Sequence, residues 1–457
     1  MNLKHYLSME LEGVEVGPPS PRPSPPGEGE ANDAFAGCGR FWLPITVLPP
    51  HKERAITRRR TCDSPRDAAA LPLPGGEGRG EGESISLNKS RNQKPPTALT
   101  RLIAFVVLMS AMTLHAAYRD DWARMKDITP RRYLCYQASA PVQIDGKLDD
   151  AAWKAAPWTE YFVDIEGAVK PKPRHRTRAK MLWDNQYFYV AAELEEPHVW
   201  ATLTNHDAVI FHDPDFEVFI DPDGDSHDYY EFEMNALNTG WDLRLPKPYK
   251  DGGPALNEWE IPGLKTAAHI QGTLNNPGDR DKGWTLEIAF PWKTLGEFAH
   301  CPAPPREGDQ WRVSFSRVEW LFDIVDGQYR KVPGKKEDNW VWSPQGIIDM
   351  HRPEKWGYVQ FTKQKPGKVK FVPDPSAPAR AVLQEIYYAQ KDYQKANKKW
   401  AARLAELDLK SELGSNLGSP PTLQPTPDGY QATVGIKLRD GRLQLWHILQ
   451  DAKVWPE

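Results

Sequence analysis

The sequence RAKMLW-DN-QYFYVAAEL, residues 178–194, decides the fold class of this 457-residue chain. Its first part, residues 178–183, and its last part, residues 186–194, are each rich in residues that favour β-strands. The Asp184-Asn185 pair between them is typical of a tight turn, because both side chains bond readily to nearby backbone groups. We therefore predict two antiparallel strands joined by a turn at residues 184–185.

Further short β-prone runs flank this hairpin. Residues 215–221, DFEVFID, alternate strictly, so that Phe216, Val218 and Ile220 share one face of a strand and the residues between them share the other. The remaining runs are residues 229–235, 284–291, 311–319 and 357–362. Because many short strands are separated by turns and no long helical stripe intervenes, we predict an all-β antiparallel β-sandwich over residues 130–362.

The composition changes after this segment. A basic, proline-bearing linker leads to residues 379–407, where apolar residues recur every three or four positions, as in a single amphipathic helix. Residues 430–434 and 442–455 are typical of short strands. We predict that residues 363–457 form a linker, a helix and a small β appendage, which is too short to bury a large core of its own.

The first quarter of the chain has a different character. Residues 1–98 are crowded with Pro, Gly, Arg and Ser, which offer too little apolar surface to offset the entropy of ordering. We expect a disordered leader here, which resembles translated repetitive DNA upstream of the true start. Residues 99–117 are typical of a signal peptide, since their apolar core, residues 102–114, is shorter than the roughly 20 residues of a membrane-spanning helix.

Export and composition limit the functions open to the chain. The signal peptide predicts a secreted or periplasmic protein without stable membrane insertion after cleavage; an N-terminal membrane anchor is the alternative. A net charge of −4 gives no electrostatic case for nucleic acid as a partner. The 18 tryptophans are numerous, and exposed indole rings match the apolar faces of sugars. Cys135 and Cys301 could form a disulfide after export, or remain two separate thiols.

Five blocks, in order along the chain, carry a resemblance to a known family. They are VQIDGKLDDAAW (142–153), MLWDNQYFYV (181–190), DFEVFID (215–221), GWTLEIAFPWKTL (283–295), and WSP to HRPEKWG (342–357). Together they resemble family 9 carbohydrate-binding modules, whose opening signature is I-D-G-x-L-D-x-x-W. The resemblance implies an antiparallel sandwich that binds a poly- or oligosaccharide, often as an accessory module in polysaccharide-degrading enzymes, with structural calcium in some members.

The resemblance also points to candidate residues for a sugar site. In the family two tryptophans hold the terminal sugar between their rings, and the corresponding positions here are Phe211 and Met350. Phe211 keeps an aromatic platform, whereas Met350 has no ring. We therefore take His351, Trp340 and Trp342 as candidates to replace the second platform.

Polar candidates lie on two of the expected strands. Glu217 coincides with a glutamate of the family's strand motif. Glu233 and Asn235 share one face of their strand by alternation and are candidate partners for sugar hydroxyl groups. The alternative is that Phe211 and Trp342 are core residues and that this chain has a different ligand.

The turn DPDGDSHD, residues 221–228, is a candidate metal site. Asp221, Asp223 and Asp225 alternate around a glycine, and calcium prefers several carboxylate oxygens from such a tight turn. The helix and glutamate of an EF-hand are absent from this stretch. A solvated acidic turn is the alternative to structural calcium.

Three classes of function follow from these residues. The first is a non-catalytic saccharide-binding protein that supports carbohydrate catabolism. The second is a glycoside hydrolase, or an accessory part of one, which needs two suitably spaced carboxyl groups; Glu217, Glu231, Glu233 and Glu287 could supply them. The third is a haem-binding redox module with Met234 or Met350 and a histidine as axial ligands, although a C-x-x-C-H motif is absent.

Overall fold

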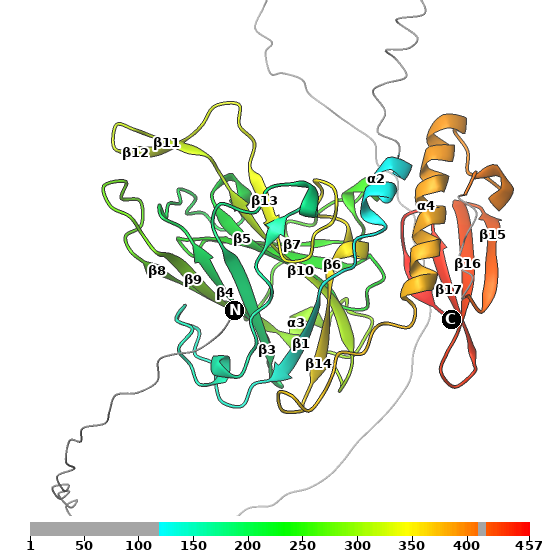
Figure 1. Ribbon diagram of the computed structural model, residues 1–457, viewed down its shortest axis with the longest axis horizontal. Coiled ribbons are helices and arrows are strands. Elements are labelled where there is room, and N and C mark those ends of the chain that lie inside the picture. The colour runs from blue at the N-terminus through cyan, green and yellow to red at the C-terminus, as the bar shows by residue number, and fades with distance from the viewer. Residues whose placement is uncertain (1–117, 410–416) are drawn as a thin grey trace, which may run out of the picture. The chain divides into compact units, whose positions relative to one another are not determined.

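The computed structural model describes residues 118–409 and 417–457 (Figure 1). The predicted leader and signal peptide lie outside the described residues, as do Cys38 and Cys62. Within the described ranges, no helix is both long enough and apolar enough to cross a membrane.

Most of the described strands belong to one twelve-stranded sheet. Its strands are β1 (Arg132–Gln137), β2 (Val163–Asp164), β3 (Thr177–Trp183), β4 (Tyr187–Glu195), β5 (Asp215–Asp221), β6 (Tyr229–Asn235), β7 (Gly240–Leu245), β8 (Lys265–Gln271), β9 (Gly283–Pro291), β10 (Gln310–Glu319), β13 (Asp338–Val341) and β14 (Gly357–Thr362). The main hydrogen-bonded order is β7-β6-β5-β10-β14-β1-β3-β4-β9-β8, with β13 beside β10 and β2 beside β13. A separate hairpin consists of β11 (Phe322–Val325) and β12 (Gln328–Lys331).

The hairpin expected at residues 178–194 is present. Strands β3 and β4 pair antiparallel, from Thr177 opposite Leu194 to Trp183 opposite Phe188. Asp184 closes the turn, since its Oδ1 accepts hydrogen bonds from the backbone N–H groups of Gln186 and Tyr187. The turn chemistry identified in the sequence therefore sets the register of this pair.

The long sheet curls so that its two halves share one core. Phe216 of β5 and Ile288 of β9 belong to the same buried cluster, although their strands are far apart in the sheet order. The rings of Phe232 on β6 and Phe290 on β9 are 5.9 Å apart, edge to face. Strand β1 joins the halves, pairing parallel with both β14 and β3. The prediction of an all-β sandwich-like fold is confirmed.

A buried glutamate explains the spacing of the first sequence block. Glu287 on β9 accepts hydrogen bonds from the backbone N–H of Asp145 (2.9 Å) and of Gly146 (2.8 Å) and from the indole N–H of Trp153 (2.7 Å). Gly146 has φ +80°, and a Cβ there would lie 2.7 Å from the backbone of Ala268, so no other residue fits. The carboxylate thus fixes the IDG turn and Trp153 against the sheet.

The C-terminal segment forms a helix and a small sheet. Helix α4 (Ala377–Asn397) packs with the antiparallel strands β15 (Ser419–Thr426), β16 (Gly429–Lys437), β17 (Leu443–Leu449) and β18 (Val454–Pro456). The N-terminal helix α2 (Tyr118–Met125) lies beside α4 (Figure 1). It joins this cluster, since Trp122 stacks on Tyr388 of α4 with ring centroids 5.5 Å apart. The remaining α-helix, α3 (Trp292–Leu295), is a single turn after β9.

One sequence-based expectation changes here, and of the two alternatives left open for the cysteines, the separate thiols are observed. The helix predicted for residues 379–407 ends at Asn397, because Lys398 adopts a left-handed conformation with φ 56°. The apolar pattern continued beyond this point because Ala401 and Leu407 are buried in the same cluster from a non-helical segment. Cys135 and Cys301 are both free thiols, so they form no disulfide with each other.

We expect Glu287→Ala to lower the free energy of unfolding by on the order of 3 kcal/mol, because three buried donors would lose their acceptor. Glu287→Gln keeps one acceptor oxygen and should cost less. Urea unfolding measures both, with Glu297→Ala, at an exposed position, as the control. A loss for Glu287→Ala no larger than that of the control would contradict this role.

Candidate functional site

Four carboxylates gather on one face of strands β5 and β6. Phe216, Val218 and Ile220 of β5 pack in the core. The residues that alternate with them, including Asp215 and Glu217, therefore lie on the opposite face of the strand. Glu217 pairs directly with Glu233 of β6, and Phe219 pairs with Glu231. We call Asp215, Glu217, Glu231 and Glu233 the acidic face.

The acidic face is buried, which raises the pKa of each carboxyl group. Asp215 is 1% exposed, Glu217 4%, Glu231 5% and Glu233 2%. Burial is the main cause of the raised pKa in all four, and repulsion by a nearby carboxylate adds to it in each. For Glu217 burial raises the pKa to about 7. Protonated and ionised forms of this group therefore coexist near neutral pH.

Two oxygens of the acidic face lack a hydrogen-bond partner within the described part of the chain. Glu233 Oε2 accepts a hydrogen bond from the backbone N–H of Phe211 (2.9 Å), and Asp215 Oδ1 accepts one from Val318 (3.1 Å). Glu217 Oε2 and Asp215 Oδ2, by contrast, are buried and have no hydrogen-bond partner among the described residues. Buried polar atoms are nearly always paired, so these two oxygens point to a missing donor or cation.

Aromatic side chains border the acidic face on one side. Phe211 is partly exposed, and its carbonyl accepts a hydrogen bond from the indole N–H of Trp320 (3.0 Å). The Lys331 ammonium lies 3.5 Å from the centre of the Trp320 ring. Burial lowers the pKa of Lys331, whereas the nearby charges of Asp213, Glu337 and Asp215 raise it. This edge therefore combines an aromatic surface with a cation.

A second aromatic group borders Glu231. Tyr249 is 48% exposed and contacts His351 edge to face, with ring centroids 4.4 Å apart. His351 Nδ1 and the Tyr229 hydroxyl are 2.8 Å apart, and His351 Nε2 lies 3.9 Å from Glu231 Oε2. Burial lowers the pKa of His351 to about 4, so its imidazole is neutral at physiological pH.

The structure brings together some of the predicted site residues. Phe211, Glu217 and Glu233 meet at the acidic face, and His351 lies beside it next to Glu231. Asn235 is fully buried, and its side chain donates hydrogen bonds to the carbonyl of Leu203 (2.8 Å) and to Asp213 Oδ2 (3.1 Å). Asn235 thus holds the preceding loop and has no free face for a ligand.

Trp340 and Trp342 lie away from the acidic face. Trp340 pairs with Arg317 of β10, whereas Ser316 pairs with Glu217, and neighbouring residues of a strand face opposite sides. Trp340 is 3% exposed and Trp342 0%, and both pack in the main core. Neither indole presents a ring to solvent, so neither can stack on a sugar in this structure. Trp342 is therefore a core residue, which was the alternative to a role in sugar binding.

Sequence reasoning missed three residues of this region. Asp215 shares its strand face with Glu217, so the alternation of residues 215–221 could have identified it. Trp320 follows strand β10, and Tyr249 lies in the connection between β7 and β8. No local sequence pattern relates Trp320 to Phe211 or Tyr249 to Glu231. Only the sheet pairing places these aromatic side chains at the site.

The predicted calcium ligands lie at the other end of β5. Asp221, Asp223 and Asp225 each offer a carboxylate oxygen within 4.8 Å of the others. Asp221 accepts backbone hydrogen bonds from Gly224 (2.9 Å) and Ser226 (3.0 Å), which fixes the turn. Burial, followed by repulsion from Asp225, raises the pKa of Asp223 to about 6.

The oxygen donors of this turn suit a hard cation, although one neighbour competes with it. Lys453 places its ammonium 3.2 Å from Asp225 Oδ2. The guanidinium of Arg380 bonds the carbonyl of Gly224 inside the same turn. Asp221, Asp223 and Asp225 would hold the ion, and Lys453 would have to yield part of its contact with Asp225.

Comparison with known proteins identifies the class of the sandwich. Residues 144–306 match the family described as carbohydrate family 9 binding domain-like. This match covers the first four sequence blocks and confirms the family resemblance for that segment, whereas the closing block at residues 342–357 lies beyond it. Residues 144–306 of the sandwich are therefore similar to the family 9 carbohydrate-binding domains.

Individual relatives are distant. Exoglucanase XynX of Acetivibrio thermocellus is 25% identical over 154 residues, which are 33% of this chain and 12% of that enzyme. A family 9 carbohydrate-binding module from Caldicellulosiruptor kristjanssonii, solved with cellotriose, is 16% identical; the match covers 53% of this chain and all of that one, with a TM-score of 0.34. A putative carbohydrate-binding protein from Bacteroides uniformis is 15% identical, covering 51% of this chain and all of that one, with a TM-score of 0.39.

We expect Glu217→Gln to stabilise the protein at alkaline but not at acidic pH. The folded-state pKa of about 7 lies above the ordinary 4.5, so the wild type loses stability as the pH rises through this window. Glutamine does not titrate, and its advantage should therefore grow by on the order of 2–3 kcal/mol between pH 4.5 and 7. Urea unfolding at several pH values measures it, with exposed Glu297→Gln as the control; a pH-independent difference would refute the assignment.

Proposed function

We propose that this chain is an exported, non-catalytic carbohydrate-binding protein that recognises a poly- or oligosaccharide through the acidic face and supports carbohydrate catabolism. The observation that carries the proposal is the pair of buried, unpartnered oxygens, Glu217 Oε2 and Asp215 Oδ2, next to the partly exposed ring of Phe211. The family match over residues 144–306 supports it.

The chemistry of a sugar suits this arrangement. Hydroxyl groups both donate and accept hydrogen bonds, so they can pair with carboxyl groups in either the ionised or the protonated form. The apolar C–H face of a pyranose can pack on an aromatic ring, which Phe211 and Tyr249 expose on either side of the acidic face. A saccharide would thus satisfy the carboxylates and cover the rings in one binding mode.

The same carboxylates argue for binding rather than hydrolysis. A retaining glycosidase needs one protonated carboxyl group and one ionised nucleophile about 5–5.5 Å apart. Glu217 and Glu233 are close enough, since each offers an oxygen within 4.8 Å of the other, but burial raises the pKa of both. Neither group is set apart as the ionised nucleophile. Release of reducing sugar by the purified chain would identify a hydrolase instead.

Export rests on the sequence alone. The signal-peptide pattern at residues 99–117 supports secretion or transport to the periplasm, where extracellular polysaccharide or its fragments are encountered. The relative XynX carries its matching segment within a much longer chain, of which the match spans 12%. A role beside degrading enzymes is therefore part of the proposal.

We expect the chain to bind at least one glycan in a calorimetric screen of cello-, xylo-, manno- and chito-oligosaccharides, with insoluble cellulose and xylan tested by co-sedimentation. Phe211→Ala should weaken binding several-fold, as expected for loss of about 1 kcal/mol of ring stacking. Its melting temperature should stay close to that of the wild type, because Phe211 is only partly buried.

The matched control is Phe371→Ala, which removes another partly buried ring, one that packs under Arg132. Binding should be unaffected by that change. A Phe211→Ala variant that binds as the wild type does but melts far lower would assign Phe211 to packing. Absence of binding to every glycan by the wild type would refute the proposed function.

We further propose that Asp221, Asp223 and Asp225 hold a structural calcium ion. An ion bound only by the folded protein stabilises it by mass action, so calcium should raise the melting temperature and a chelator should reverse the rise. Asp223→Asn should abolish the calcium effect, whereas Asp279→Asn, in an exposed loop, should preserve it. If neither calcium nor a chelator changes the melting temperature, the proposal is wrong and the turn is an acidic turn whose charge is balanced by Lys453.

A further inference from the structure

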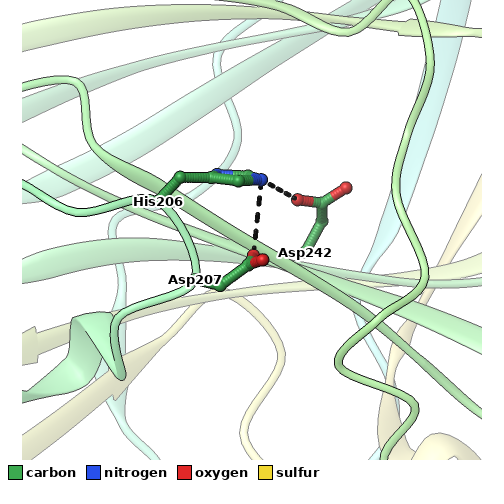
Figure 2. Close-up of side chains that lie close together, drawn as sticks. All are labelled: His206, Asp207 and Asp242. Atoms are coloured by element: carbon green, nitrogen blue, oxygen red, sulfur yellow. Dashed lines mark ion pairs between the residues drawn. The ribbon is translucent and has the colours of Figure 1, made fainter.

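A second type of polar cluster lies on the edge strand β7, apart from the acidic face. Figure 2 shows the imidazole of His206 with the carboxylates of Asp207 and Asp242 turned toward it. Asp242 is on β7, whereas His206 and Asp207 belong to the connection between β4 and β5. Trp241 pairs with Glu233, so the neighbouring Asp242 lies on the opposite face of the sheet from the acidic face.

One nitrogen of His206 is fixed by the backbone. His206 Nδ1 lies 3.0 Å from the carbonyl oxygen of Gly240, which can only accept, so Nδ1 carries the proton. In the neutral ring Nε2 then carries a lone pair that is free to bind a metal ion. Metal-binding histidines have this arrangement, with the other ring N–H donated to a carbonyl or carboxylate.

The free nitrogen faces three carboxylate oxygens. His206 Nε2 is 3.1 Å from Glu260 Oε2, 3.4 Å from Asp207 Oδ1 and 3.6 Å from Asp242 Oδ1. Ligand atoms about 2.0–2.2 Å from zinc in a tetrahedral site are about 3.3–3.6 Å from one another. A protonated Nε2 could donate a hydrogen bond to one of the oxygens only, and the two longer distances exceed ordinary hydrogen bonds. Without a metal, Nε2 is at hydrogen-bond distance from Glu260, whereas its distances to Asp207 and Asp242 match those between ligand atoms around one shared ion.

A buried carboxylate supplies one of the ligand atoms. Asp242 is 2% exposed, and its Oδ2 accepts a hydrogen bond from the backbone N–H of Ile261. Its Oδ1 faces His206 and lies 3.6 Å from Nε2, which is longer than an ordinary hydrogen bond. A cation between Oδ1 and Nε2 would neutralise this buried carboxylate.

We infer that His206, Asp207 and Asp242 form a binding site for a divalent transition-metal ion of the zinc class, with Glu260 or water as a fourth ligand. The imidazole distinguishes this site from the oxygen-only turn at Asp221, since nitrogen ligands favour zinc over calcium. The ion would fasten the β4–β5 connection, which carries Phe211, to β7. The inference is independent of what the acidic face binds.

Titration of the metal-free full-length chain with Zn²⁺ and with Co²⁺ tests this site. We expect calorimetry to detect Zn²⁺ binding and Co²⁺ to give the visible absorption of four-coordinate cobalt. His206→Gln should remove one bound equivalent or weaken it at least about tenfold, the loss typical of damaged metal sites. Asp207→Asn, at a largely exposed position, should weaken the same equivalent without disturbing the fold.

The control is His269→Gln on β8 (Lys265–Gln271), which alters a histidine outside the cluster and should bind as the wild type does. Circular dichroism of each variant verifies that the fold is retained. Equal metal binding by His206→Gln and wild type would overturn the site, as would absence of Zn²⁺ and Co²⁺ binding to the wild type. Displacement of Co²⁺ by equimolar Ca²⁺ would overturn the assignment to the zinc class.

Discussion

The period-two alternation of β5 is the constraint on which the arrangement of this protein depends. Its inward residues Phe216, Val218 and Ile220 help to build the core between the two halves of the sheet. Because the core fixes which side of the strand faces inward, Asp215 and Glu217 must lie on the opposite face. Their pKa values are raised because this second face is itself covered, which leaves Asp215 1% and Glu217 4% exposed.

Sequence patterns predicted the fold well where the information is local. The Asp184 turn and its flanking strands, and the alternation in β5, required only neighbouring residues and are present as expected. The end of α4 was misjudged because the apolar spacing continues through Ala401 after the helix stops. Burial of an apolar residue is compatible with more than one backbone path, so spacing alone overextended the helix.

The candidate site was only partly predictable, for a related reason. Glu217 and Phe211 were found through a family motif, and Glu233 through alternation. Trp340 was selected for its ring, but pairing with Arg317 places it on the core side, and that pairing is not encoded in either strand alone. His206 and Asp242 are likewise joined only by the three-dimensional fold, whereas the Asp221 turn is contiguous and visible in the sequence.

The junction of α2 with α4 has a consequence for how the chain folds. The backbone of Tyr118 donates a hydrogen bond to Asp392, 274 residues later, and Trp122 stacks on Tyr388. Closing so long a loop in an unfolded chain carries a large entropic cost, which shrinks once the intervening sandwich has formed and brings the two ends together. We therefore expect α2 to dock on α4 after the sandwich has folded, so that this contact would report on completion of the sandwich.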